Sequence, residues 1–416
     1  LEGTRSRTGK TLTPKFGALK TSIEPALDGR IEDINFVPIS IDFERTLEES
    51  LYLDEMLGKR KPGETLSNLV KSAPLLLKAN YGFLSLQFGE PLSLREYQKQ
   101  HVVSERSRRL ARGDPKASEY DPSINAKDRY TLTSSLAYEL LSRIDGASVA
   151  MPTHIAAAIL LYFRGGIKIG RLIDEMDWLR EEILLRGGHI ALVEGAPRKY
   201  TAQRAIRMLG QLVIERRHEF FVPNTQEPGL YKNYIALGSY RNKVLHLFAQ
   251  EALWACALYA LDRNAEKNRN LKKGENTKGQ NRFYSVSSLL EHVIFLDKLM
   301  SFEFVRDRTV TLTDDERKEM HYLVLQKMIQ RGVFMSTSYQ SIRPGSNLDN
   351  YKSKRTVQIA SAASSGVDPY LENLAVTLAP DGERLFGLLC SIVWPFIDGY
   401  YSVSFCLSTL VPPALT

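Results

Sequence analysis

The segment LEGTRSRTGK, residues 1–10, decides how the rest of the sequence is interpreted. It holds one carboxylate, two glycines, three hydroxyls and three cations around a single apolar residue. Glycine lets a backbone turn tightly and approach a ligand closely, and the planar fork of arginine donors matches a phosphate group at two points. The segment is therefore predicted to be a loop that binds a small phosphorylated molecule, with a solvated basic turn as the alternative.

Further blocks extend this pattern over the first 95 residues and return near residue 240. The chain reads EGTRSR at 2–7, VPISI at 37–41, FGEPLSL at 88–94 and SYRNK at 239–243. Between the second and third blocks stand Glu49, Tyr52, Glu55, Leu57, Gly58, Lys61 and Glu64. These blocks resemble the third and fourth signature blocks, and the patterns around them, of the glycerolipid acyltransferases. They are most similar to the dihydroxyacetone phosphate branch of that family.

The resemblance implies an acyl-CoA-dependent O-acyltransferase that esterifies a hydroxyl of dihydroxyacetone phosphate in ether-lipid and glycerolipid synthesis. The alternatives are glycerol 3-phosphate as the acceptor, or a non-catalytic membrane-associated protein of the same fold. The third block of the family binds the substrate phosphate, a role that carries over to Glu2, Gly3, Arg5, Ser6, Arg7 and Lys10. The fourth block is expected to line the acyl-CoA side with Val37, Pro38, Ile39 and Ile41. No cofactor or metal is implied. The expected location is a peroxisomal membrane surface, with the mitochondrial outer membrane or the endoplasmic reticulum as alternatives.

The catalytic pair of the family has no counterpart at the expected place. Acyl transfer to a hydroxyl needs a positioned base, commonly an imidazole held by a carboxylate. In the family a His-x-x-x-x-Asp block precedes the third block, so the chain is expected to be a fragment that starts inside the third block, and no catalytic residue is assigned. His292 and Asp297 have the same spacing. However, residues 287–300 are predicted to form an amphipathic helix, on which a five-residue step separates two side chains around the axis.

Composition places the chain among globular proteins of two or three domains. It has 416 residues, of which 43% are hydrophobic and 25% charged. The net charge of +7 suits anionic phosphates, coenzyme A or an anionic membrane face. The basic run at 104–112 lacks the aromatic residues that stack on bases, so no nucleic-acid partner is expected. Cys256, Cys390 and Cys406 have no metal-type spacing and are expected to be reduced core residues.

The expected fold class is an α/β acyltransferase layer, of which only the C-terminal half is present, followed by a mainly α-helical domain. Over residues 1–97, helices are predicted at 16–27, 44–57 and 64–79, a buried parallel strand at 34–41 and another strand at 83–88. Residues 98–130 are expected to be a linker. Residues 131–416 are expected to form the helical domain, with helices at 134–144, 153–163, 169–185, 202–217, 231–261 and 287–300 and a disordered insertion near 262–282.

The last apolar run, residues 385–410, is long enough to span a membrane. Pro395, Asp398 and Gly399 lie in its middle, and an aspartate is costly in lipid. A buried or interfacial helical hairpin is therefore predicted rather than a membrane span.

Overall fold

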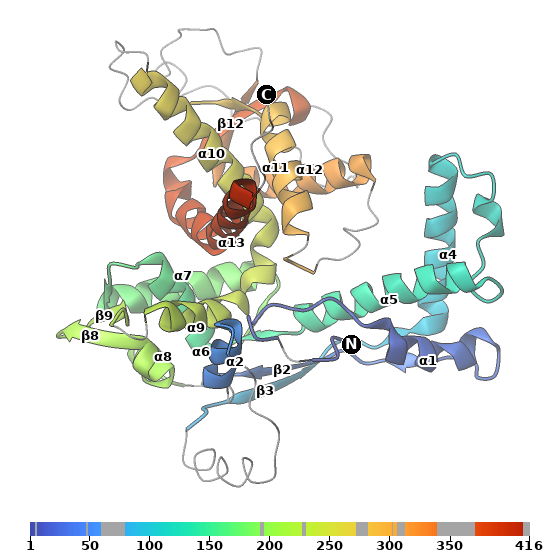
Figure 1. The fold of residues 1–416 in the computed structure, drawn as a ribbon, viewed down its shortest axis with the longest axis horizontal. Coiled ribbons are helices and arrows are strands. Elements are labelled where there is room, and N and C mark those ends of the chain that lie inside the picture. Colours follow the sequence, from blue (N-terminus) through green and yellow to red (C-terminus); the bar gives the residue numbers. More distant parts are fainter. Residues whose placement is uncertain are drawn as a thin grey trace. The chain divides into compact units, whose positions relative to one another are not determined.

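A computed structural model describes residues 1–4, 6–46, 49–59, 80–191, 195–226, 230–271, 282–301, 303–305, 313–338 and 371–410. The chain forms two compact units (Figure 1). Unit 1 comprises Leu1–His246 and Phe304–Arg308, and unit 2 comprises Leu247–Glu303 and Thr309–Thr416. Unit 1 therefore continues well past residue 131, where the sequence analysis expected the helical domain to begin. The helix expected at 64–79 lies outside the described residues.

The N-terminal part of unit 1 is built on two helices. Helix α1 (Phe16–Leu27) buries Leu19, Ile23 and Leu27, which recur at helical spacing. It packs against α5 (Ala126–Gly146), and the two helices contribute to one apolar cluster. The helix predicted at 16–27 is thus confirmed, with Pro25 inside its last turn.

Two short antiparallel pairs of strands adjoin these helices. Strand β1 (Asn35–Phe36) pairs with β4 (Leu92–Ser93), and β2 (Ile39–Phe43) pairs with β3 (Leu84–Phe88). Helix α2 (Glu49–Met56) follows β2 and begins later than the predicted residue 44.

The prediction of a buried parallel strand at 34–41 is wrong. Successive side chains of a strand point to opposite faces, and β2 buries Ser40 and Asp42 while Ile39 and Ile41 are 41% and 51% exposed. An apolar run in the sequence therefore became a strand whose polar side chains face the interior of unit 1. The β2–β3 sheet consequently presents an exposed apolar face to which Leu84, Leu86 and Phe88 of β3 also belong.

Helix α4 (Leu94–Ala111) occupies much of the segment expected to be a linker. The Ser93 hydroxyl caps its start by accepting the backbone N–H of Glu96. Near its other end, the Arg109 guanidinium lies 3.3 Å from Glu105 and 2.9 Å from Asp128 of α5. Part of the basic run thus joins two helices. The 3-10 turn η1 (Ala117–Glu119) lies between α4 and α5.

The rest of unit 1 contains a module of helices around a small sheet. Its strands are antiparallel in the order β6-β9-β8, and α6 packs against α7, α8 and α9. A parallel pair, β5 (Val149–Ala150) with β7 (His189–Ile190), adjoins it. In chain order the module comprises α6 (Pro152–Tyr162), β6 (Ile167–Lys168), α7 (Ile169–Leu185), α8 (Arg198–Leu209), η2 (Gly210–Leu212), β8 (Val213–Arg217), β9 (Phe220–Pro223) and α9 (Leu230–Asn242).

Unit 2 repeats this order of elements. Its strands are antiparallel in the order β10-β12-β11, and α10 packs against α11, α12 and α13. The 3-10 turns η6 (Leu371–Asn373) and η7 (Pro380–Gly382) connect elements here, and η3 (Leu245–Leu247) lies where unit 1 passes into unit 2. In chain order the main elements are α10 (Ala249–Leu271), β10 (Tyr284–Ser285), α11 (Val286–Met300), α12 (Asp314–Gln330), β11 (Phe334–Ser338), β12 (Leu374–Leu378) and α13 (Glu383–Leu410).

The two modules share one topology. In each, a helix, a strand, two helices and two antiparallel strands follow in this order among the described elements, and the sheet has the order first, third, second strand. This is the connectivity of a winged helix, a variant of the helix-turn-helix. In each, a closing helix, α9 or α13, then packs on the first helix of the module. The chain therefore contains the same module twice, which the sequence analysis did not detect.

Some of the predicted helices are confirmed, and others have different bounds in the structure. The helices expected at 169–185 and 287–300 are confirmed as α7 and α11. The helix expected at 202–217 instead ends at Leu209, before Gly210 with φ +54°, and the chain continues into β8. The helix expected at 231–261 is two helices, α9 and α10. Residues 262–271 of the expected insertion belong to α10, whereas 272–281 lie outside the described residues.

The helical hairpin predicted for residues 385–410 is wrong. This segment is one continuous helix, α13, with Pro395 inside it. Its first half buries Leu385, Leu388, Leu389, Ile392 and Val393. That apolar stripe packs on α10, so the helix continues through the proline without a turn.

Candidate functional site

The first residues of unit 1 fold into a tight loop, as the sequence analysis predicted. The Glu2 carboxylate accepts the backbone N–H of Leu12 at 2.5 Å. Gly3 and Gly9 have φ angles of +72° and +74°, in the left-handed region that suits glycine. Glu2 and Gly3 therefore shape the loop, and their role towards a substrate stays a prediction.

The end of α9 holds this loop in place. The Asn242 side-chain amide donates to the carbonyl of Thr8 at 2.8 Å, which joins residues 234 positions apart. A Cβ added to Gly9 would lie 2.0 Å from the Ser239 carbonyl oxygen, so only glycine allows this approach. The loop at 1–10 and the block at 239–243 thus form one structure.

Arg241 supplies a buried positive charge beside this contact. Its guanidinium donates twice to the Asn242 side-chain oxygen, at 3.2 Å and 2.8 Å. The residue is only 6% exposed, and burial lowers the pKa of Arg241 to about 10. It remains cationic at neutral pH, and a charge removed from water acts more strongly on its surroundings.

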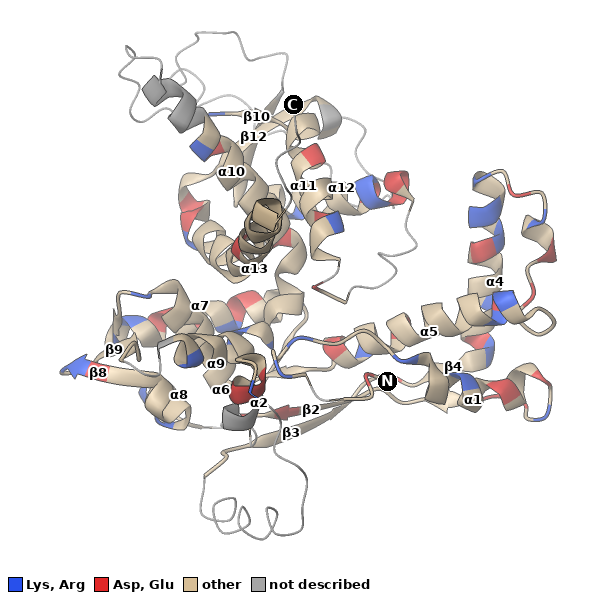
Figure 2. Cartoon of the chain, in the orientation of Figure 1, with Lys and Arg blue, Asp and Glu red and all other residues tan. Residues whose placement is uncertain are grey.

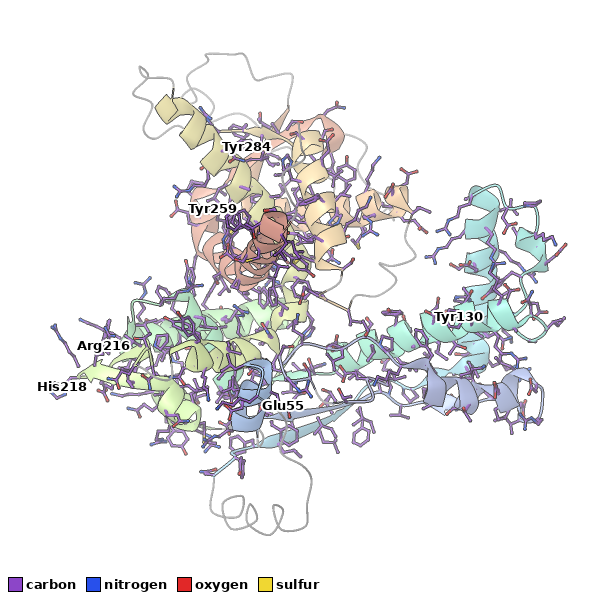
Figure 3. All side chains as sticks on the ribbon, in the orientation of Figure 1. Glu55, Tyr130, Arg216, His218, Tyr259 and Tyr284 are labelled. Carbon is purple, nitrogen blue, oxygen red and sulfur yellow. The ribbon has the colours of Figure 1, made fainter. Side chains whose placement is uncertain are left out.

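Three of the predicted phosphate ligands of the loop have partners of their own among the described residues. The Arg7 Nε lies 2.5 Å from the Glu55 carboxylate of α2, labelled in Figure 3, and the Arg7 side chain is 55% exposed. The Lys10 ammonium lies 5.7 Å from the centre of the Phe304 ring. Ser6 Oγ is 3.4 Å from Thr8 Oγ1. Arg5 lies outside the described residues. A phosphate bound through the Nε edge of Arg7 would compete with Glu55.

A buried polar cluster lies behind the loop. Thr11 Oγ1 donates to the Asp145 carboxylate at 2.5 Å. Burial raises the pKa of Asp145 to about 6, although the Thr11 hydrogen bond and the charge of Lys243 oppose that shift. Asp42 of β2, turned inward, accepts the Ser40 hydroxyl and the Val149 backbone N–H, each at 2.8 Å.

Two histidines complete this cluster in neutral form. Burial lowers the pKa of His154 to about 3 and that of His246 to about 4. His154 Nδ1 accepts the backbone N–H of Met151 at 3.1 Å, and His246 Nε2 lies 3.4 Å from the Ser148 hydroxyl. Both rings are therefore uncharged hydrogen-bonding groups at neutral pH.

The His292–Asp297 pair in unit 2 is not a catalytic dyad. His292 is exposed, and its Nδ1 lies 2.9 Å from the Ser288 carbonyl on its own helix. Asp297 is fully buried and forms an ion pair with Arg317, and His321 Nε2 lies 3.7 Å from it. Since His321 is also fully buried, a substrate cannot reach it.

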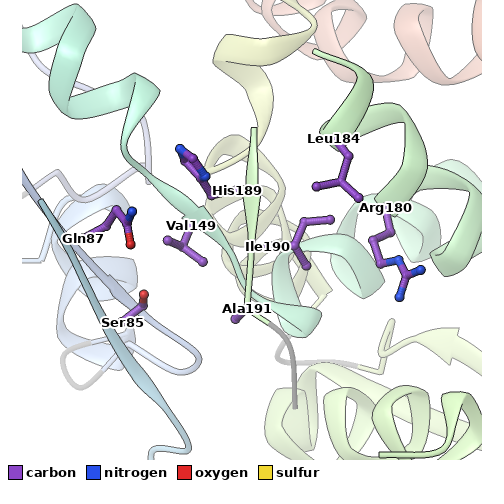
Figure 4. Close-up of a pocket in the computed structure, with 8 residues that line it drawn as sticks. All are labelled: Ser85, Gln87, Val149, Arg180, Leu184, His189, Ile190 and Ala191. Carbon is purple, nitrogen blue, oxygen red and sulfur yellow. The ribbon is translucent and has the colours of Figure 1, made fainter. Parts of the chain in front are cut away.

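A cleft of about 410 Å³ lies elsewhere in unit 1, between β3, β5, β7 and α7 (Figure 4). Its lining is mixed, and Figure 4 shows His189 and Arg180 on either side of Ile190, so these two polar groups do not converge on one point. Among the described residues, no three His, Cys, Asp or Glu side chains are grouped to hold a metal ion.

Comparison with known proteins agrees with the signature blocks. The family model described as the glycerol-3-phosphate acyltransferase C-terminal region matches residues 52–416. The chain belongs to this acyltransferase family. The mitochondrial glycerol-3-phosphate acyltransferase 1 of Rattus norvegicus is 28% identical over 99% of the chain and 52% of its own length. Its Homo sapiens counterpart is 32% identical over 63% of the chain and 34% of its own length.

The other branch of the family matches as well. The dihydroxyacetone phosphate acyltransferase of Homo sapiens is 31% identical over 62% of the chain and 38% of its own length. The chain thus spans about half, or less, of the length of these relatives.

The family's fourth block, residues 37–41, runs into β2 and alternates between exposed and buried positions. Pro38 is buried, whereas Val37, Ile39 and Ile41 are 47%, 41% and 51% exposed. Their expected place on the acyl-CoA side stays a prediction.

Sequence reasoning missed most of the buried polar cluster. It noted that residues 239–243 resemble a family block but gave Arg241 and Asn242 no role. One signal was available for β2, because Ser40 and Asp42 alternate with isoleucines, as expected for a strand with a polar inner face. His154, His246 and Asp145 carry no comparable signal, since their proximity depends on how distant segments pack.

Proposed function

We propose that this chain is part of an acyl-CoA-dependent enzyme that esterifies a hydroxyl of dihydroxyacetone phosphate, with the loop at 1–10 binding the substrate phosphate. The supporting observation is that this loop, rich in hydroxyls and cations, is fixed against the end of α9 beside the buried charge of Arg241. A phosphate is bound best by donors held in fixed geometry. The exposed Arg7 supplies such a fork once Glu55 gives way.

The alternative acceptor is glycerol 3-phosphate. Relatives named for each acceptor match the chain at similar identity, and both acceptors carry the phosphate that the loop is proposed to bind. The alternative to an enzyme is a non-catalytic protein of the same fold.

We also propose that β2 and β3 belong to an α/β acyltransferase layer with Val37, Ile39 and Ile41 on its acyl-CoA side. The exposed apolar face of the β2–β3 sheet supports this proposal, because a contiguous apolar patch marks a surface that packs against something else. The proposed site of action is a membrane surface. A peroxisomal location is the first expectation, and the mitochondrial outer membrane or endoplasmic reticulum are the alternatives.

Binding of dihydroxyacetone phosphate to the 416-residue chain tests the phosphate site. Arg7→Ala should weaken that binding, measured by isothermal titration calorimetry, by roughly 10-fold or more, because it removes a charged fork. Arg30→Ala is the matched control, since Arg30 is similarly exposed and is 3.2 Å from its own carboxylate partner, Asp28. If Arg7→Ala instead abolishes acyl-CoA binding and leaves the phosphate compound unaffected, the loop binds coenzyme A and this assignment is wrong.

An assay of acyl transfer complements the binding test. No residue of the chain is assigned as the base, so turnover of labelled acyl-CoA and dihydroxyacetone phosphate by the 416-residue chain alone is expected to match buffer. Turnover well above buffer would require a base among residues 1–416 and would change the proposed division of roles.

A further inference from the structure

The end of α13 is exposed to an unusual degree. All ten residues from Tyr401 to Leu410, here called the terminal arm, are exposed. Tyr401, Phe405 and Leu410 are 71%, 60% and 77% exposed, although each has a large apolar side chain. An aqueous protein surface rarely carries so many large apolar groups together.

The terminal arm also lacks a polar face. It contains no charged residue, and Figure 2 shows the end of α13 in the colour of uncharged residues. At 100° per residue, Tyr401 and Phe405 lie on one side of the helix, and Val403, Leu407 and Leu410 lie on the other. Between these two sides lie the small residues Ser402, Ser404, Ser408 and Thr409. A helix with large apolar side chains on opposite sides and no charge belongs inside a protein or in lipid.

The hydroxyls at its end are satisfied within the helix. The Ser408 hydroxyl donates to the Phe405 carbonyl at 2.7 Å, and the Thr409 hydroxyl donates to the Cys406 carbonyl at 2.6 Å. Such internal hydrogen bonds allow serine and threonine to leave water at low cost. These two hydroxyls are thus compatible with a hydrocarbon environment.

The repeated module shows that this arm is an addition. The closing helix of the first copy, α9, has 13 residues and ends in buried Tyr240, Arg241 and Asn242. The closing helix of the second copy, α13, has 28 residues, and only its first half is buried in the module. The extra length is therefore unnecessary for closing the module.

We propose that the terminal arm inserts into the hydrocarbon region of a lipid bilayer and so attaches unit 2 to a membrane. The ten residues of the arm extend about 15 Å, half of the hydrocarbon thickness of about 30 Å, so they reach well into that region. The absence of charge means that apolar transfer drives the attachment, and anionic headgroups contribute little. The attachment does not depend on the chemistry proposed for unit 1.

Flotation of the 416-residue chain with vesicles tests this insertion. The chain should bind vesicles of phosphatidylcholine alone as well as vesicles that also contain phosphatidylserine, and 0.5 M salt should not release it. Phe405→Asp should lower the partition coefficient at least about 10-fold, because a carboxylate is costly in the hydrocarbon region. Phe295→Asp is the matched control: Phe295 is 65% exposed on α11 of the same unit, and its replacement should leave binding unchanged.

A label on the arm gives an independent measurement. Cys406 is exposed in the terminal arm, so a polarity-sensitive fluorophore attached there should shift to shorter wavelength when phosphatidylcholine vesicles are added. The labelled Cys406→Ser variant provides the background. Circular dichroism checks that unit 2 of Phe405→Asp is still folded. A loss of vesicle binding in the folded variant then reflects the arm.

Three outcomes would overturn the proposal. Equal loss of binding in Phe405→Asp and Phe295→Asp would mean that the arm has no special role. Binding only to anionic vesicles, or its loss in salt, would assign the attachment to surface charges elsewhere. Absence of vesicle binding, together with a concentration-dependent dimer that Phe405→Asp dissociates, would show that a second copy of the chain covers the arm.

Discussion

Helices α9 and α13 close two copies of one module, yet their ends differ in character. The end of α9 is polar and buried, and its Asn242 holds a loop from the start of the chain. The end of α13 is apolar and exposed, and the hydroxyls of Ser408 and Thr409 donate to carbonyls of the same helix. The same scaffold thus positions a binding loop in one copy and an arm in the other.

The difference teaches that the module fixes where a closing helix runs, while the sequence at its end decides what that helix does. A buried guanidinium such as that of Arg241 needs acceptors, and so requires neighbouring chain to be folded around it. An apolar end requires only an apolar environment. We therefore expect substitutions at the ends of α9 and α13 to have different effects, which experiments can compare directly.

The largest effect is expected at the polar end. Asn242→Ala removes the donor to Thr8 and an acceptor of Arg241, and should lower the free energy of unfolding of unit 1 by about 2–4 kcal/mol. Thr409→Ala at the other end removes a hydroxyl that bonds its own helix, and should change stability by less than about 0.5 kcal/mol. Hydrogen exchange of peptides from α5, α9 and α13 in increasing urea would measure both. Similar losses in the two variants would remove the contrast between the ends.

An effect of similar size is expected from acid, because Asp145 offsets part of what two histidines contribute. His154 and His246 are protonated near pH 6.5 when unfolded, but their pKa values are about 3 and 4 when folded. The unfolded state therefore binds more protons as pH falls below 6.5, and unit 1 loses roughly 2–3 kcal/mol per histidine by pH 4.5. The pKa of Asp145, raised to about 6, acts in the opposite direction: its contribution to stability is present at low pH and is lost as pH rises towards 6.

Urea titrations at pH 7.5 and 4.5 would measure this acid effect. His246→Gln should reduce the pH dependence of the free energy of unfolding of unit 1 by about the contribution of one histidine. Asp145→Asn should make that dependence steeper. If unit 1 of the unmodified chain became more stable between pH 6.5 and pH 4.5, the contribution of Asp145 would outweigh that of His154 and His246 together.

The smallest effect concerns the ligand proposed for the loop. Glu55→Gln removes the carboxylate that holds Arg7 at 2.5 Å, and should strengthen binding of dihydroxyacetone phosphate by up to about 5-fold, the usual range for an exposed ion pair. Asp28→Asn, which releases the exposed Arg30, is the control. Calorimetry would measure both affinities. Weaker binding in Glu55→Gln would indicate that the Arg7–Glu55 pair orients the loop for the phosphate. Glu55 would then support phosphate binding and would not compete with it.

Local patterns were enough to predict several elements. The apolar spacing of residues 16–27, 169–185 and 287–300 predicted α1, α7 and α11, because one buried stripe at helical period is visible in the sequence. The signature blocks of residues 2–7 and 37–41 predicted the family. The parallel strand failed because an apolar run does not reveal which face will be buried or which strand will pair with it.

The candidate site was predictable only in part. Glycines and cations in the first ten residues predicted a tight, polar loop. Its anchor on Asn242 depends on a contact 234 residues along the chain. The placement of Asp42, Asp145 and His246 in one cluster likewise depends on packing. The shifted pKa values of Asp145 and His246 follow from burial that no local pattern encodes.

The sequence by itself determined that residues 16–27, 169–185 and 287–300 form helices, that the first ten residues turn tightly, and to which family the chain belongs. These features depend on neighbouring residues, whose spacing and chirality act within a few positions. Only the tertiary structure decided that one module occurs twice, that the first loop docks on α9, and that the end of α13 stays uncovered. Each of these depends on which surfaces meet, and burial, the main source of folding free energy, is a property of the whole packed chain.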